Sequence, residues 1–181
     1  MKYAKRIIAA IVIILFIFLF FTPYGWGTLL TIGLMADDSC SCKREVVPED
    51  KFKELAGIDL PPYETSYYDD THGGFNGDGH MSMKFTFSAP NGKKLAETLA
   101  SADHWSPAPM NETVETLFSW GSYANGVKAP HIDSGHYFFY DKQTDTYEPR
   151  ADLLTDSASY NFMIAAYDHD RLTMYYYQLD T

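Results

Sequence analysis

One apolar run, residues 7–21, constrains this chain more than any other feature of its sequence. Lys2, Lys5 and Arg6 precede the run, and the uncharged stretch continues as far as Ala36. A helix that spans a bilayer needs about 20 predominantly apolar residues, so this segment is long enough to cross a membrane. The sequence therefore predicts an N-terminal transmembrane helix.

The charges on either side of the run predict its orientation. Basic residues stay on the cytoplasmic side, so we expect a cytoplasmic N-terminus and an extracytoplasmic remainder. A cleaved signal peptide has the same charged start, but Leu34-Met35-Ala36 places a large residue where its cleavage site needs a small one. A hairpin that re-enters the bilayer is a third alternative. We expect the helix to end near Pro23, followed by an interfacial segment that holds Tyr24 and Trp26.

This segment divides the chain into an anchor and a head. We assign residues 1–36 to the membrane anchor with its interfacial segment, 37–47 to a polar linker, and 48–181 to a single extracytoplasmic domain of ordinary size. Cys40 and Cys42 lie in the linker, too close in sequence for a relaxed disulfide and without another cysteine to pair with. We therefore expect either pairing with a cysteine of another chain or no role.

The part beyond the anchor is strongly acidic. Residues 37–181 carry 11 basic and 24 acidic residues, and therefore a formal charge of −13. Nucleic acid and anionic lipid surfaces would be repelled, so we exclude nucleic acid as a partner. The charge fits either a domain that is kept soluble by its acidity or one that meets a basic protein partner.

Hydrophobic periodicity predicts the secondary structure of the head. Met81, Met83 and Phe85 alternate with polar residues, which is the period of two that a half-buried strand requires. Leu95 and Leu99 show helical spacing. The same reasoning predicts helices from Pro48 to Gly57, over 91–102, and from Asn111 to near Gly121, with strands over 64–71, 80–88, 136–141, 160–167 and 172–179.

These elements come in runs and do not alternate strictly between strand and helix. Such an order is typical of the α+β class. We therefore expect an antiparallel β-sheet with helices packed on one face. Asp168 and Asp170 lie between the last two strands, where we expect them to form the turn of a hairpin.

The densest polar cluster is the loop over 69–80, which is rich in aspartate, histidine and glycine. Its candidate binding residues are Asp69, Asp70, His72, Asp78 and His80. Aspartate and glycine are also the residues that any long turn between strands uses, and their spacing here does not match a calcium loop or a helical zinc motif.

The leading functional hypothesis is a membrane-anchored, non-enzymatic binding domain. An alternative is a metal-dependent enzyme, hydrolase-like, that uses His72, Asp78 and His80 as ligands. A second alternative is an immunity-type protein that neutralises a basic toxin. No glycine loop precedes a helix as a phosphate-binding loop would, and no nucleophile elbow occurs, so we expect no cofactor.

Several short sequence motifs carry a family resemblance. They are Asp70-Thr71-His72-Gly73-Gly74-Phe75, Gly77-Asp78-Gly79, Gly135-x-Tyr137-Phe138-Phe139-Tyr140-Asp141, Tyr160-Asn161-Phe162 and Tyr175-Tyr176-Tyr177-x-Leu179-Asp180-Thr181. With these motifs the chain resembles an uncharacterised family of small exported or membrane-anchored proteins of anaerobic Gram-positive bacteria. The resemblance implies a single domain outside the membrane and no particular activity. Asn76 stands where relatives often have histidine, which argues against a histidine-based metal site.

Overall fold

The computed structural model describes residues 47–73, 77–150, 152–155 and 157–181. They belong to one compact unit, Val46–Thr181. The anchor and the linker that the sequence predicts lie outside the described residues, except for Val47. No helix of the described part is both long enough and apolar enough to cross a membrane.

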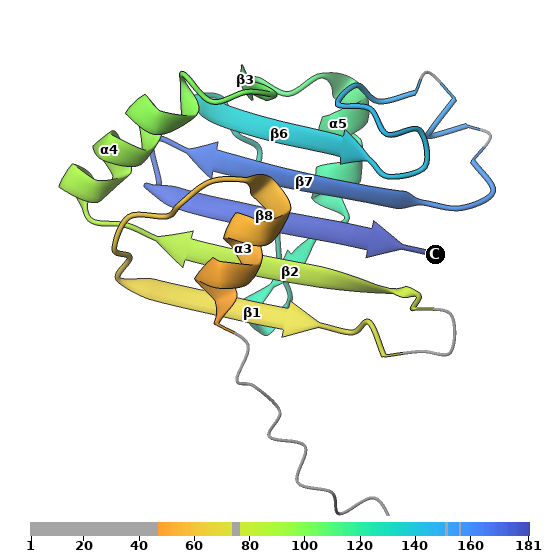
Figure 1. The fold of residues 1–181 in the computed structure, drawn as a ribbon, viewed down its shortest axis with the longest axis horizontal. Helices are drawn as coiled ribbons and strands as arrows, with labels where there is room; N and C mark the ends of the chain where they lie inside the picture. Colours follow the sequence, from red (N-terminus) through yellow and green to blue (C-terminus); the bar gives the residue numbers. More distant parts are fainter. Residues whose placement is uncertain (1–46, 74–76, 151, 156) are drawn as a thin grey trace, which may run out of the picture. The chain divides into compact units, whose positions relative to one another are not determined.

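The main element of the fold is an antiparallel sheet with the strand order β1-β2-β8-β7-β6-β3 (Figure 1). Its strands are β1 (Thr65–Asp70), β2 (Gly79–Thr86), β3 (Trp105–Pro107), β6 (Gly135–Asp141), β7 (Asn161–Asp168) and β8 (Thr173–Asp180). The last two strands in the sequence lie at the centre, and β8 pairs with β2 over its whole length. The expected α+β class with an antiparallel sheet is confirmed.

Apolar and polar residues alternate along β2, and this alternation determines which face of the strand is buried in the core. Met81, Met83 and Phe85 are at most 4 % exposed and pack into one core cluster with the helices above them. Ser82 and Lys84 lie between them and point to the opposite face, because successive side chains of a strand alternate. The strand predicted over 80–88 is therefore confirmed as β2, together with its face, but it ends two residues earlier, at Thr86.

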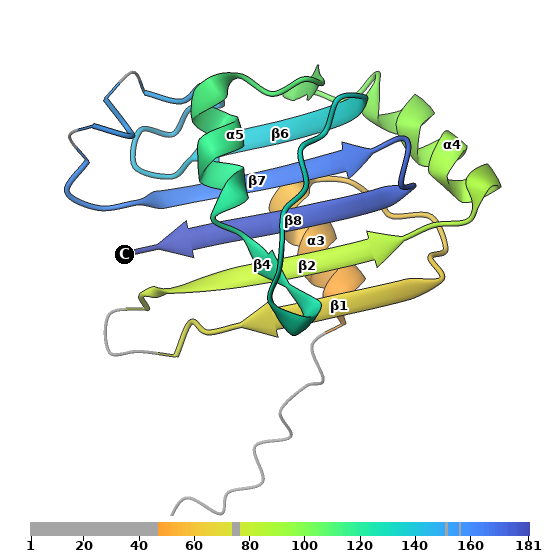
Figure 2. The same cartoon turned by 180° about the vertical axis from the view of Figure 1, so that it is seen from behind.

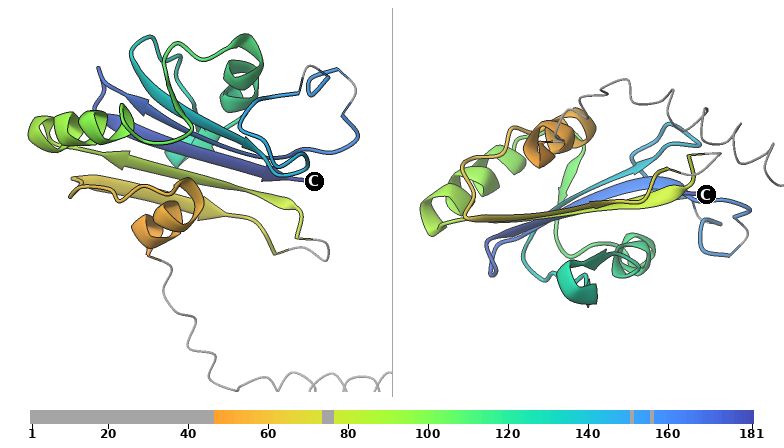
Figure 3. Two further views of the ribbon diagram at one scale, coloured as in Figure 1. Left: turned by 45° about the horizontal axis from the view of Figure 1, so that its top comes forward. Right: turned by 90° about the horizontal axis from the view of Figure 1, so that it is seen from below.

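Helices cover both faces of the sheet. Helices α3 (Pro48–Ala56) and α4 (Ala89–Leu99) pack on one face, and α5 (Glu112–Ser119) packs on the other (Figures 2 and 3). A small hairpin lies on the α5 face as well; it consists of β4 (Ser122–Tyr123), the 3-10 turn η1 (Ala124–Gly126) and β5 (Val127–Lys128). The prediction that the helices pack on one face only is wrong.

The central strands give the physical reason for this second layer. Phe138 and Phe139 are neighbours on β6, and Tyr176 and Tyr177 are neighbours on β8, yet all four are at most 6 % exposed. Neighbours on a strand point to opposite faces, so both faces of these strands carry large apolar side chains. A single layer of helices would leave half of them in water.

Local sequence signals set the ends of the helices. Pro48 lies in the first turn of α3, and Gly57 ends that helix in the left-handed conformation with φ of 71°. Asn111 caps α5, where its side chain accepts a hydrogen bond from the Val114 N–H at 2.9 Å. These ends agree with the predicted ones. Strands β3, β4 and β5 were not predicted, because two or three residues are too few to show a period.

The turn between β7 and β8 forms as expected. The Asp168 carboxylate accepts hydrogen bonds from the backbone N–H groups of Asp170 and Arg171, each at 2.9 Å. Leu172 completes the turn in the left-handed conformation with φ of 49°. The resulting hairpin occupies the middle of the sheet, where β7 pairs with β6 and β8 pairs with β2.

Candidate functional site

The loop predicted as a binding site connects β1 to β2 at one end of the sheet, and residues 74–76 of this loop lie outside the described part. Thr71 and His80 close its base. The Thr71 N–H donates to the His80 carbonyl oxygen, and the His80 N–H donates to Thr71 Oγ1, both at 2.9 Å. The loop therefore starts from a fixed base that continues the pairing of the two strands.

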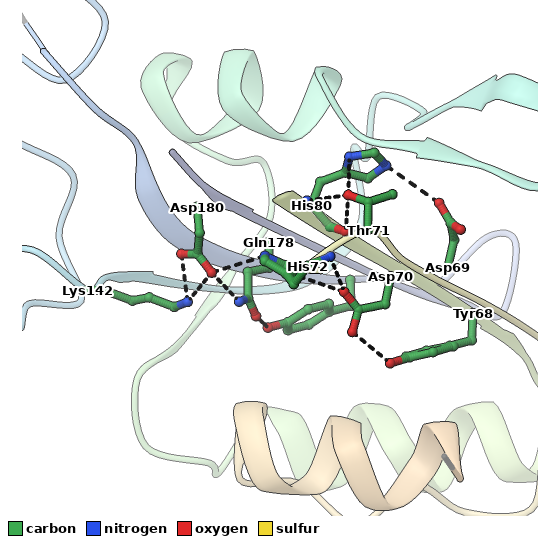
Figure 4. Close-up of polar contacts among 10 residues, drawn as sticks. Tyr68, Asp69, Asp70, Thr71, His72, His80, Lys142, Gln178 and Asp180 are labelled. Carbon is green, nitrogen blue, oxygen red and sulfur yellow. Dashed lines mark hydrogen bonds and ion pairs between the residues drawn. The ribbon is translucent and has the colours of Figure 1, made fainter. Parts of the chain in front are cut away.

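His72 lies between two carboxylates (Figure 4). Its Nδ1 atom is 2.7 Å from Asp70 Oδ1, and its backbone N–H donates to the same oxygen at 2.9 Å. Its Nε2 atom is 3.1 Å from Asp180 Oδ2. This second contact is too bent to be a hydrogen bond, and it acts as an ion pair when the ring is protonated. With only 15 % of its side chain exposed, His72 is held as a bridge between strands β1 and β8.

Asp180 extends this bridge to a neighbouring segment. Lys142, which follows β6, donates from Nζ to both carboxylate oxygens of Asp180 at 2.7 Å. Gln178 Nε2 donates to Asp180 at 2.6 Å, and Gln178 Oε1 accepts a hydrogen bond from the buried Tyr176 hydroxyl at 2.7 Å. We call the set Tyr68, Asp70, His72, Lys142, Tyr176, Gln178 and Asp180 the His72 network.

Burial and hydrogen bonding shift two pKa values in the His72 network. Burial alone would raise the pKa of Asp70, but hydrogen bonds from His72 and Tyr68 outweigh it and hold that pKa below its usual value. Burial, together with the hydrogen bond to Asp70 at 3.0 Å, raises the pKa of the Tyr68 hydroxyl to about 12. Asp70 is therefore an anion and Tyr68 a neutral donor at neutral pH.

The other candidate residues of the loop lie elsewhere. His80 alternates with Met81 along β2, so its ring lies on the α5 face, opposite the His72 network. There His80 Nδ1 is 3.1 Å from Thr71 Oγ1, and Nε2 is 3.5 Å from Asp69 Oδ2 (Figure 4). Asp78 is exposed in the loop.

The metal-enzyme alternative required His72, Asp78 and His80 around one ion. The structure separates the two histidines onto opposite faces of the sheet, so these three side chains do not converge. Among the described residues, no group of three or more His, Cys, Asp or Glu side chains is arranged to hold a metal ion.

Sequence reasoning found Asp70 and His72 but missed Lys142, Gln178 and Asp180. These residues lie far along the chain and reach the loop only because β8 inserts beside β2. One signal was present in the sequence: Tyr176, Gln178 and Asp180 are spaced by two, so any strand there places them on one face.

Two histidines contact each other at the opposite end of the sheet. His136 Nδ1, on β6, is 3.3 Å from Nε2 of His169 in the β7–β8 turn. Burial, and then the neighbouring His169, lowers the pKa of His136, which keeps that ring neutral at neutral pH. The two residues are 33 positions apart, and no local pattern in the sequence connects them.

Comparison of the chain with protein-family models, with curated proteins and with solved structures found no match.

Proposed function

We propose that the chain is a single-pass membrane protein whose folded head binds a basic protein partner outside the membrane. The support for the anchor is the uncharged stretch from Ile7 to Ala36 behind three basic residues. The support for binding, in place of catalysis, is the geometry of the His72 network.

The placement of His72 is the observation that carries this proposal. A histidine that acts as general base needs a ring nitrogen within hydrogen-bond reach of the proton it removes. Both ring nitrogens of His72 face carboxylates of the protein, at 2.7 Å to Asp70 and 3.1 Å to Asp180. The imidazole is therefore a structural link that fixes the base of the loop. The side chains of Asp69, Asp78 and His80 in the described part of the loop are open to solvent.

Charge favours a basic partner. Residues 48–181 carry nine basic and 21 acidic residues, and therefore a formal charge of −12. At the loop, Asp69 and His80 are each more than 40 % exposed in their side chains, and Asp78 is exposed. Such a surface accelerates the approach of a positively charged protein and repels nucleic acid. A basic toxin, as in the immunity hypothesis, would be one such partner.

The orientation is tested by protease protection. An epitope fused after Thr181 should be removed when protease is added to intact spheroplasts, because the head lies outside. A control epitope on a cytoplasmic protein should survive. Protection of the fused epitope in intact spheroplasts would contradict the proposal.

The binding site is tested by a photo-crosslinking amino acid at Asp78 in the membranes of the native host. We expect an adduct whose yield falls as salt rises, since screening weakens surface charge attraction. The same amino acid at exposed Asp133, in the segment before β6, is the matched control. Equal yields at the two positions would contradict the assignment of the loop as the binding surface.

A further inference from the structure

A small pocket of about 220 Å³ lies between α4 and the β7–β8 turn, at the end of the sheet away from the His72 network. Its apolar wall consists of Ala89, Ala96 and Leu172. Its polar lining consists of Lys93, His169 and Tyr167. No acidic side chain lines this pocket, although acidic residues outnumber basic ones in the protein.

The hydroxyl of Tyr167 is directed towards the α4 side of this pocket. A Cβ atom built on Gly92, which also lines the pocket, would lie 2.5 Å from the Tyr167 hydroxyl oxygen. Tyr167 is only 1 % exposed, yet its hydroxyl takes part in none of the hydrogen bonds found among the described residues. The hydroxyl oxygen is not among the buried polar atoms that lack a partner, so it reaches the accessible surface of the pocket, where it can donate a hydrogen bond to a ligand.

Two basic side chains stand beside this donor. Lys93 makes no ion pair or hydrogen bond among those found in the described part of the chain. His169 Nε2 contacts Nδ1 of His136 at 3.3 Å. Of the two carboxylates in the turn, Asp168 is 2 % exposed in its side chain and pairs with Arg171, and Asp170 does not line the pocket. Lys93 thus keeps its donor capacity for a bound group, and His169 lines the pocket beside it.

We propose that this pocket binds the carboxylate of a small molecule with a short apolar tail. The carboxylate accepts a hydrogen bond from the Tyr167 hydroxyl and lies beside Lys93 and His169. The tail packs against Ala96 and Leu172. The pocket is smaller than the roughly 300–1,000 Å³ of sites for drug-sized ligands, so it suits a ligand of few atoms.

A titration with butyrate tests this site. The probe is the full chain in detergent micelles, labelled with ¹⁵N and followed by NMR at the backbone amides of Gly92 and Lys93. We expect saturable shifts with butyrate and at least tenfold weaker binding of butyramide, which has the same shape without the charge. Equal shifts with both compounds, no saturation up to about 0.1 M butyrate, or tighter binding of inorganic phosphate than of butyrate would overturn the proposal.

Two neighbouring lysines supply a matched pair of variants. Lys93→Gln should weaken butyrate binding about tenfold, which is about 1.4 kcal/mol. Lys94→Gln removes the same charge from the next residue of α4, which lines a different groove, and should leave binding unchanged. Tyr167→Phe should also weaken binding, after a check that it still melts cooperatively. Equal losses in the two lysine variants would show that only net charge matters, and would overturn the site.

Discussion

At the end of the sheet where β8 finishes, His72 lies between two carboxylates, whereas at the opposite end His169 lines an open pocket. In the His72 network, each side chain contacts another member of the same network. At the pocket, Lys93 and the Tyr167 hydroxyl make no polar contact among those found in the described residues. Paired polar groups stabilise a fold, and unpaired donors are available to a ligand. The comparison therefore assigns stability to one end and recognition of a small ligand to the other.

Removal of β8 should have the largest effect on stability, because this strand runs between the two ends of the sheet that are compared above. Truncation after Asp168 deletes Met174 and Tyr176, which are fully buried, and leaves β2 and β7 without their shared partner. Each large buried side chain contributes about 1.5–3 kcal/mol, so the loss of several exceeds the margin of a typical domain. Circular dichroism should show no cooperative melting. A truncated chain that melts at the parent temperature would refute the central role of β8.

A glycine at each end gives the next test. A Cβ on Gly135, where φ is 155°, would lie 1.8 Å from the Tyr167 carbonyl oxygen. Gly77 has φ of 75° and nothing within 4 Å of its built Cβ. Gly135→Ala should therefore cost about 3 kcal/mol or more of unfolding free energy, and Gly77→Ala about 1 kcal/mol, in urea titrations. Equal costs would show that the backbone around Gly135 can shift to accommodate the added methyl group with little loss of stability.

The two loop histidines should differ in their effect on stability. His72→Ala leaves Asp70 and Asp180 without the ring between them and should cost about 1–3 kcal/mol. His80→Ala removes an exposed ring with a single 3.5 Å contact to Asp69 and should cost about 0.5 kcal/mol or less. Urea unfolding of both variants checks the order. A larger cost for His80→Ala would show that His80, and not His72, has the structural role in this loop.

Replacement of Asp70 should have the smallest effect on stability, and this effect should depend on pH. Because its pKa is lower in the folded state than the ordinary value of 3.8, Asp70 stabilises the fold above that pH. This contribution is lost as the pH falls through the lower, folded-state pKa. Asp70→Asn should therefore show a shallower loss of stability in acid than the parent, measured by urea midpoints from neutral pH to about pH 2. Parallel curves for the two proteins would contradict this role.

Local patterns in the sequence predicted most of the elements but not their layers. The alternation around Met83 and the cap at Asn111 act within a few neighbouring residues, so they can be read without the fold. Coverage of both faces could have been inferred from consecutive large residues such as Phe138 and Phe139, but that inference needs the strand to be central.

The candidate site could be predicted only in part, because some of its residues lie far apart along the chain. Asp70 and His72 are two residues apart, and the turn chemistry of aspartate marks them. Asp180 joins them because β2 and β8 pair with Gly79 opposite Asp180. That register is a long-range contact, and nothing local in either segment specifies it. The pocket at Tyr167 depends in the same way on the packing of α4.

The place of β8 also governs when this protein can finish folding. On the ribosome, β1 and β2 emerge first and β6 and β7 much later, and each pair forms contacts of its own. The two pairs become one sheet only when β8 inserts between β2 and β7, after every other strand has been synthesised. A nascent chain that lacks β8 therefore keeps two exposed sheet edges. It cannot form the complete sheet before β8 has been synthesised.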